Sequence, residues 1–369
     1  MTQRKDKLVR TTAWLALSIL ILVLCGELAC HAMDLGKSTY MQPDEQLGYQ
    51  LIAGKQVEWN FEGHSRDPIS SAGFRDIEHD KAKPAGVKRI LILGDSVSEG
   101  LQVPLDKTVS RQLQHLLDEK SAGKIEVINA SCSCYSLGQM ALFYDRIASV
   151  YEPDEIFLLY GLGNAVGSIR SAGDMTAIGR PYFYMEKGVL LSDSTLVPPK
   201  SICRTAQFLL RHSSLANYLC HVDFTHRFSD SNYQGIRAFI ISNIRLVLSR
   251  HSDYPPQDQS EVRNALLSLL NRVGALKGAR LTVFTLPSLG LKHFDDDYNE
   301  VKLLGAQQGF AVVDFNAAFA KGGRKAFLKF HLSEIGHEIM ARRMYEYWEH
   351  IGSSVAARET KYGPGGLPL

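Results

Sequence analysis

The chain has 369 residues, of which 45% are hydrophobic and 22% are charged, and its formal net charge at pH 7 is +2. These are ordinary values for a globular protein, and the length allows one large domain or a domain with an elaboration. The small net charge, without a basic stripe that interleaves with aromatic residues, excludes an electrostatic case for nucleic acid as a partner.

The N-terminus carries a membrane-targeting pattern. Four basic residues among the first ten precede the apolar stretch Ala13–Met33, which only Glu27 interrupts. The length of this stretch matches the roughly 20 residues that are needed to span a bilayer. Its basic flank predicts that the N-terminus is cytoplasmic and that the rest of the protein lies outside. We therefore predict a single-pass anchor within residues 1–35. A cleaved signal peptide and lipidation at Cys25 or Cys30 are the alternatives.

Five short apolar runs predict the strands of a parallel sheet that is covered on both faces. They are Ile90–Leu93, Ile125–Asn129, Glu155–Tyr160, Leu281–Leu286 and Ala311–Asp314. The helical patterns that separate or follow them are Thr108–Leu117, Leu137–Ser149, Ser260–Leu276, Glu300–Gln308 and Ser333–His350. Because strands alternate with helices, the predicted fold class is α/β, with helices on both faces of a five-stranded parallel sheet.

Composition divides the chain into four predicted parts. They are an N-terminus with anchor (1–35), a polar and irregular linker with an N-terminal extension (36–85), the α/β domain (86–352) and a flexible tail (353–369). Between residues 166 and 259 the alternation of strands and helices breaks, over a length too great for a plain connection. We interpret this segment as an insertion that caps the sheet. It contains a predicted helix, Ala206–Leu219, and the aromatic cluster Pro181–Tyr184, which lines an acyl or sugar subsite or forms the insertion's own core.

Small or polar residues follow the first three predicted strands. Ser96 ends the tripeptide Gly94-Asp-Ser, Cys134 lies in the second loop and Asn164 in the third. The carboxyl ends of parallel strands meet at one edge of the sheet, where open α/β sheets bind ligands. His331 begins the pattern His-Leu-Ser-x-x-Gly-His before the last helix. A serine nucleophile needs a nearby base, and histidine has a suitable pKa, so the pattern predicts a site for nucleophilic catalysis.

At these residues the sequence resembles the SGNH/GDSL hydrolase superfamily, over roughly residues 70–350. Gly94-Asp-Ser96 matches the first block, Asn164 the asparagine of the third and His331 the histidine of the last. The resemblance looks closest to membrane-anchored members with a Gly-Phe-Arg-Asp element before the first strand, here Gly73–Asp76. It implies a three-layer α/β/α, flavodoxin-like fold.

The resemblance also implies a serine esterase or acyl hydrolase that acts outside the cytoplasm. Ser96 would attack the ester, His331 would act as the base, and the amides of Ser96 and Cys134 with the side chain of Asn164 would form the oxyanion hole. The expected partner is an ester-bearing substrate with O-acetyl or other O-acyl groups, such as an acylated polysaccharide. No metal or cofactor is expected, because no cysteine and histidine spacing resembles a zinc site.

Two other functions stay open at this point. An O-acyltransferase on envelope polysaccharide would use the same nucleophile, with a sugar hydroxyl in place of water. A catalytically weak or inactive relative would keep the fold to bind glycan or protein in the cell envelope.

The last block departs from the family pattern. The family usually has an aspartate two or three residues before the histidine, where this chain has Lys329 and Leu328. Because nothing local replaces that carboxylate, we expect a Ser96–His331 dyad whose imidazole is oriented by a main-chain carbonyl, and therefore slow turnover. Cys134 also stands where the family usually has glycine, and Ala165 follows Asn164 where aspartate is usual.

Overall fold

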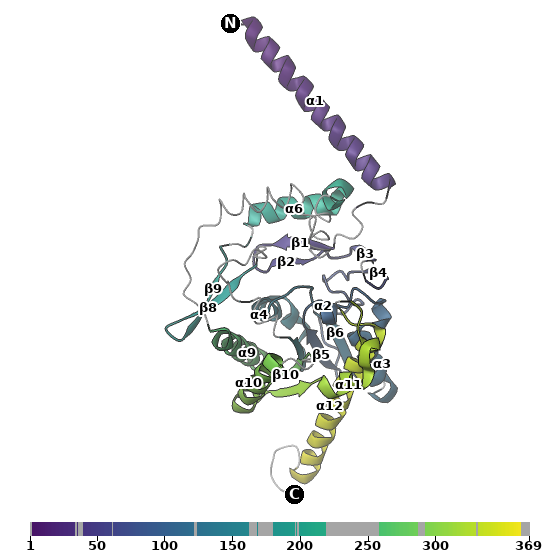
Figure 1. Cartoon of the computed structure of the whole chain (residues 1–369), viewed down its shortest axis with the longest axis vertical. Helices are drawn as coiled ribbons and strands as arrows, with labels where there is room; N and C mark the ends of the chain where they lie inside the picture. Colours follow the sequence, from purple (N-terminus) through teal and green to yellow (C-terminus); the bar gives the residue numbers. More distant parts are fainter. Residues whose placement is uncertain are drawn as a thin grey trace. The chain divides into compact units, whose positions relative to one another are not determined.

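The computed structural model describes residues 2–33, 35, 40–60, 62–121, 124–161, 168, 180–195, 197, 199–218, 258–286, 292–329 and 331–362. The chain divides into two compact units. One consists of Met1–Pro43 and Pro198–Ser252, and the other of Asp44–Val197 and Asp253–Leu369. The larger unit contains the α/β fold (Figure 1). The domain boundaries drawn from composition stay predictions.

The larger unit is built on a five-stranded sheet in the order β11-β10-β7-β5-β6. These strands are β5 (Lys88–Leu93), β6 (Ile125–Asn129), β7 (Glu155–Tyr160), β10 (Arg280–Thr285) and β11 (Ala311–Asp314). Every neighbouring pair is parallel. All six residues of β7 are buried, because the central strand of a parallel sheet is covered on both faces. The predicted fold class and all five predicted strands are therefore confirmed.

Helices pack on both faces of this sheet. Alternate residues of the strands, among them Ile90 and Phe157, join a core with α3 (Val109–Ser121), α11 (Asn316–Gly322) and α12 (Glu334–Tyr362). On the other face α4 (Leu137–Arg146) packs against α9 (Gln259–Leu276), and α9 contacts β10 and α10 (Lys292–Gln308). Gly274 of α9 lets that helix approach Ile156 of β7 closely. The sheet thus forms the middle of three layers (Figure 1), and β5 lies inside it between β7 and β6.

The N-terminal extension contains more regular structure than the sequence predicts. Its short strands are β1 (Met41–Asp44), β2 (Gly48–Leu51), β3 (Gln56–Trp59) and β4 (Ser65–Pro68). β3 and β4 pair antiparallel. Strands of four residues with polar side chains give little periodicity, which is why the prediction of an irregular linker over this part is wrong.

The predicted insertion contains a hairpin of β8 (Tyr182–Glu186) and β9 (Val189–Asp193). Tyr182 and Phe183 are buried, so in the described part of the aromatic cluster these two rings act as core residues. The helix expected at Ala206–Leu219 begins earlier and is interrupted: α6 spans Lys200–His212, Ser213 is extended, and residues 214–218 are helical again.

The smaller unit contains α1 (Thr2–Ala32) and α6. Within α1, Val9–Ala32 is long and apolar enough to cross a membrane, with a mean hydropathy of 2.3, although a signal sequence would have the same character. Glu27, the charge that interrupts the apolar stretch, accepts hydrogen bonds from Ser213 Oγ at 2.7 Å and from the Ser214 and Leu215 amides at 2.5 and 3.1 Å. These bonds satisfy a carboxylate that a purely apolar environment would penalise.

Candidate active site

Ser96 lies on a sharp turn after β5. Asp95 caps the short helix α2 (Ser96–Glu99), and its side chain accepts from the Val97 amide at 3.0 Å. A Cβ at Gly94 would come within 2.0 Å of Ser98 Oγ and 3.2 Å of Leu159 Cβ, so a larger residue there would displace its neighbours. Gly100 ends the turn in the left-handed conformation at φ 69°. The sequence therefore presents Ser96 at the carboxyl end of a central strand, partly exposed.

The loop after β6 lies beside this turn. The Cys132 amide donates to the Gly94 carbonyl at 3.2 Å, and the Asn129 side chain donates to the Ser98 carbonyl at 2.9 Å. Cys134 has φ 61°, a left-handed conformation that costs a residue with a Cβ roughly 1–2 kcal/mol. A glycine would adopt it freely. The fold thus keeps a glycine-type backbone here in spite of the cysteine.

His331 completes the contact with the serine. Its Nε2 lies 3.0 Å from Ser96 Oγ, although 235 positions separate the two residues in the chain. The backbone before it is fixed, since the Leu328 amide donates to the His331 carbonyl at 2.7 Å and Phe327 bridges to Leu332. Ser96 and His331, predicted as nucleophile and base, are therefore within hydrogen-bond distance.

A carboxylate is the partner of His331 Nδ1, where the sequence predicted only a main-chain carbonyl. Glu62 Oε1 is hydrogen-bonded to His331 Nδ1. The Glu62 side chain is only 8% exposed and that of His331 22% exposed. Ser96, His331 and Glu62 thus form a continuous chain of hydrogen bonds. The expectation of an imidazole without a carboxylate is wrong, because the acid comes from the N-terminal extension and not from the last block.

The turn of the β3–β4 hairpin brings Glu62 to this position. Gly63 has φ 69°, and a Cβ there would lie 2.0 Å from the Gln102 carbonyl oxygen. Ser65 Oγ donates to the Leu101 carbonyl at 2.6 Å. The hairpin turn is therefore pressed against the chain that follows α2, so the acid and the nucleophile are positioned by adjoining segments.

Arg75, the arginine of the Gly-Phe-Arg-Asp element, is hydrogen-bonded to the end of the turn that carries Ser96. Its guanidinium donates to the carbonyls of Glu99, Gly100 and Val103 at 3.1, 2.9 and 2.7 Å. It also pairs with Asp67 at 2.9 Å. Arg75 thus satisfies carbonyl oxygens that the end of a short helix leaves without partners.

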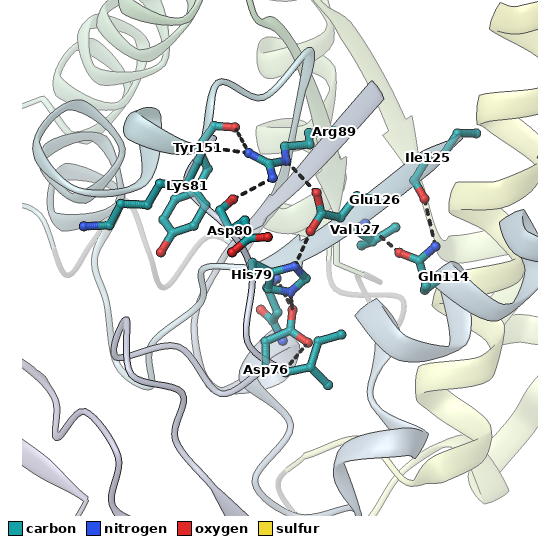
Figure 2. A network of polar contacts seen from close by, with 12 residues as sticks. Asp76, His79, Asp80, Lys81, Arg89, Gln114, Ile125, Glu126, Val127 and Tyr151 are labelled. Atoms are coloured by element: carbon teal, nitrogen blue, oxygen red, sulfur yellow. Dashed lines mark hydrogen bonds and ion pairs between the residues drawn. The ribbon is translucent and has the colours of Figure 1, made fainter. Parts of the chain in front are cut away.

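The next residues of the extension attach it to the sheet through a polar network (Figure 2). Asp76 Oδ2 accepts from the Asn129 amide at 2.6 Å and lies 3.2 Å from His79 Nε2. His79 Nδ1 lies 2.6 Å from Glu126, which also accepts from Arg89 at 2.6 Å. Burial alone lowers the pKa of His79, but the contacts with Asp76 and Glu126 outweigh it and raise that pKa. The network joins the extension to β5 and β6, from Asn129 at the carboxyl end of β6 to Arg89 and Glu126 near the amino ends of the two strands.

Glu99 fixes the second loop from inside the protein. Its side chain is fully buried, and its Oε2 accepts from both the amide and the hydroxyl of Ser133 at 2.5 Å. Burial raises the pKa of Glu99 to about 7, although Ser133 and Arg75 act in the lowering direction. Two short bonds to the residue before Cys134 hold the left-handed turn in place.

Two of the three predicted oxyanion donors are in the described structure. Within the described residues, neither the Ser96 amide nor the Cys134 amide has a hydrogen-bond acceptor. Asn164 lies outside the described residues. Sequence reasoning missed Glu62 and Glu99; the only local signal for Glu62 was its place beside Gly63 in a turn between two polar, alternating segments.

No group of three or more histidine, cysteine, aspartate or glutamate side chains that could hold a metal occurs among the described residues. His337, the second histidine of the last block, accepts from the Val109 amide at 3.2 Å and is fully buried. Burial lowers the pKa of His337 to about 3. It packs against Gly100 as a neutral structural residue.

Comparison with known proteins gives structural matches only. No family model and no curated protein matches the chain. The esterase EstA from Pseudoalteromonas sp., inhibited by monoethylphosphonate, has a TM-score of 0.42 and 13% identity over 72% of this chain and 99% of its own. TesA has a TM-score of 0.41 and 11% identity over 72% and 99%.

A catalytic mutant of Axe2, an acetylxylan esterase from Geobacillus stearothermophilus, has a TM-score of 0.39 and 14% identity over 72% of this chain and 95% of its own. By its own strand order, the described part of the chain has a three-layer α/β/α architecture around a five-stranded parallel sheet, and His331 contacts Ser96 in the turn after β5.

Proposed function

We propose that this protein is a serine esterase or acyl hydrolase, with Ser96 as nucleophile, His331 as base and Glu62 as the residue that orients the base. The observation that carries the proposal is the continuous set of contacts from Glu62 through His331 to Ser96 Oγ. A serine hydroxyl becomes a nucleophile when a positioned base accepts its proton, and the base works best when a third group fixes its tautomer.

The mechanism follows from these contacts. With its proton on Nδ1 toward Glu62, His331 accepts the Ser96 proton at Nε2 while Oγ attacks the ester carbonyl. The amides of Ser96 and Cys134 stabilise the resulting oxyanion, and Asn164 is proposed as a third donor. The imidazolium then protonates the leaving alcohol, and the acyl-serine forms. Water, activated by the same nitrogen, attacks the acyl-serine and releases the acid.

Glu62 weakens the alternative hypothesis that the protein is a non-catalytic binding protein. That hypothesis depended on the missing carboxylate of the last block. A buried acid hydrogen-bonded to Nδ1 supplies the orienting group that a histidine base requires, and glycan binding does not call for that arrangement. We therefore favour the enzyme, with O-acyl groups on an envelope polysaccharide as the proposed substrate and the N-terminal helix as the proposed anchor. Transfer of the acyl group to a sugar hydroxyl would use the same acyl-serine.

Hydrolysis of a small acetyl ester, such as 4-nitrophenyl acetate, tests the proposal with the full-length protein in detergent. The wild type should hydrolyse the ester above the background rate, and Ser96→Ala and His331→Ala should each abolish that excess. Ser98→Ala removes a hydroxyl two residues away and serves as a matched control. Equal rates for the wild type and Ser96→Ala would contradict the proposal.

A further inference from the structure

The start of β8 is packed beside the second loop of the site. The Phe183 amide donates to the Ser168 carbonyl at 2.8 Å, and Ser168 Oγ accepts from the Gly138 amide at 3.0 Å. A Cβ at Gly138 would lie 2.0 Å from the Phe183 ring, so strand and helix touch there. Because α4 begins directly after the Cys134 loop, this contact brings Arg180, three residues before Phe183, to the same side of the molecule.

Arg180 differs from the other arginines of the core in its hydrogen bonding. Its Nε is buried and has no hydrogen-bond partner in the described part of the chain, and it forms no ion pair with a described residue. Arg75, Arg89 and Arg263 by contrast use their guanidinium groups on carbonyls and carboxylates. A partly buried guanidinium with unused donors is costly unless something else satisfies it.

The charge of Arg180 acts on the second loop. Burial raises the pKa of the Cys134 thiol to about 11, and Arg180 opposes that rise. It opposes the rise that burial causes in the pKa of Tyr49 as well, and the Tyr49 hydroxyl donates to the Ser133 carbonyl at 3.2 Å. Both groups are neutral at neutral pH, so neither compensates the cation.

Asp95 and Glu99, the two acids whose charges act on the Cys134 thiol together with Arg180, have other partners. Asp95 caps α2 through the Val97 amide, and Glu99 accepts two hydrogen bonds from Ser133. Neither forms an ion pair with Arg180 in the described structure. A positive charge with a buried, unpartnered Nε therefore lies near the loop that would hold the oxyanion, without an ion pair to a carboxylate of the described residues.

We propose that Arg180 binds a carboxylate or phosphate group of the substrate, which makes this protein selective for esters of acidic molecules. The proposal rests on the proposed esterase function for the position of the ester, but the binding itself does not require turnover. A guanidinium presents two parallel N–H groups that match the oxygens of a carboxylate or phosphate, and desolvation strengthens such a pair.

Equilibrium binding to the full-length Ser96→Ala protein tests this without interference from hydrolysis. The probes are 4-acetoxybenzoate, its methyl ester as the neutral counterpart, and 4-acetoxyphenyl phosphate. We expect the anionic probes to bind about 10- to 100-fold more tightly than the neutral one, the effect of one charge-assisted hydrogen-bonded pair. The ranking of carboxylate against phosphate identifies the acidic group.

Three further substitutions in the Ser96→Ala background locate the effect. Arg180→Met should abolish the preference for anionic probes and leave the affinity for the methyl ester unchanged, whereas Arg180→Lys should retain part of it. Lys187→Met removes an exposed cation from the turn of the same hairpin and should change nothing. The unfolding transition of each variant checks its folding, and Arg180→Lys keeps the test valid if Arg180→Met is unstable.

Equal binding of charged and neutral probes by the Ser96→Ala protein would overturn the proposal. So would a loss in Arg180→Met that is the same for all three probes, since that would mark Arg180 as a structural residue. Absence of turnover in the wild type, together with an Arg180-dependent preference in binding, would overturn the esterase function and leave the anion site standing.

Discussion

Glu62 and His331 are 269 positions apart in the chain, and they meet because a hairpin turn of the extension lies over the nucleophile turn. In the proposed mechanism, a carboxylate on Nδ1 stabilises the imidazolium that forms when Ser96 loses its proton, and a main-chain carbonyl, with no full charge, would do so less. The chemistry at the residue scale therefore requires an acid that no local pattern around the histidine reveals.

Removing the charge of Glu62 should slow the reaction without weakening substrate binding. We expect Glu62→Gln to lower kcat on a small acetyl ester by about 10²–10⁴, with KM within a few-fold of the wild-type value. The neutral amide of glutamine stabilises the imidazolium of His331 less than the charged carboxylate does. Glu58→Gln on the neighbouring strand is the matched control. If Glu62→Gln kept wild-type kcat, Glu62 would have no role in orienting the base.

Glu99 makes stability depend on pH. Its pKa of about 7 in the folded protein lies above its ordinary value of 4.5. The stabilisation is thus fully present below pH 4.5 and is lost as pH rises through 7, about 3 kcal/mol in all. Glu99→Gln cannot titrate and should lack that part of the slope. Urea unfolding of both proteins between pH 5 and 8 measures the difference, and parallel curves would show that Glu99 titrates at its ordinary pKa.

At the scale of elements, two turns decide whether the site assembles. The β3–β4 turn brings the acid, and the turn from Gly94 to Gly100 brings the serine. Their contact depends on a glycine, because the backbone at Gly63 is left-handed and a Cβ would collide with the Gln102 carbonyl. A displaced hairpin would move Glu62 away from the imidazole while leaving the sheet intact.

Gly63→Ala should therefore lower kcat, in addition to the unfolding free energy that is lost when alanine adopts a left-handed backbone. We expect kcat to fall at least 10-fold, by analogy with the loss that a small misplacement of catalytic groups causes. Gly54→Ala is the control, since Gly54 has φ 72° but nothing within 4 Å of its Cβ position. It should cost roughly 1–2 kcal/mol in unfolding free energy with normal kcat. Equal kcat in the two variants would show that the turn does not position the acid.

The elements that the sequence predicted well are those whose signal is local. Ile90–Leu93 and Glu155–Tyr160 are apolar runs because buried parallel strands are covered on both faces, so their positions followed from composition alone. The extension escaped prediction, because its four-residue strands carry polar residues. The helix start at Lys200 was missed, although Pro199 directly before it is a usual beginning, because the prediction followed the apolar pattern instead.

The same distinction holds for the site. Ser96 and His331 were predictable because each lies in a short motif at a strand end or helix start. Glu62 was not, because its position arises only when the extension folds back onto the turn that carries Ser96. The role proposed for Arg180 likewise depends on contacts between segments that are distant in the chain. No spacing in the chain encodes those contacts.

At the scale of the whole molecule, we expect α1 to anchor the protein with the α/β fold outside the cytoplasm. The basic residues before the apolar stretch favour that orientation. The protein should stay in the membrane fraction after a carbonate wash, and a reporter that is active only in the cytoplasm should be silent when it is fused after Leu369. A bright reporter, or release of the protein by carbonate, would contradict this topology.

Covalent labelling by a fluorophosphonate tests most directly whether Ser96 is an activated nucleophile. Intact-mass and peptide analysis of the full-length protein should show one adduct, on Ser96, that is absent from Ser96→Ala and forms much more slowly in His331→Ala and Glu62→Gln. An unlabelled wild-type protein at high reagent concentration, or an adduct that persists in Ser96→Ala, would contradict the account.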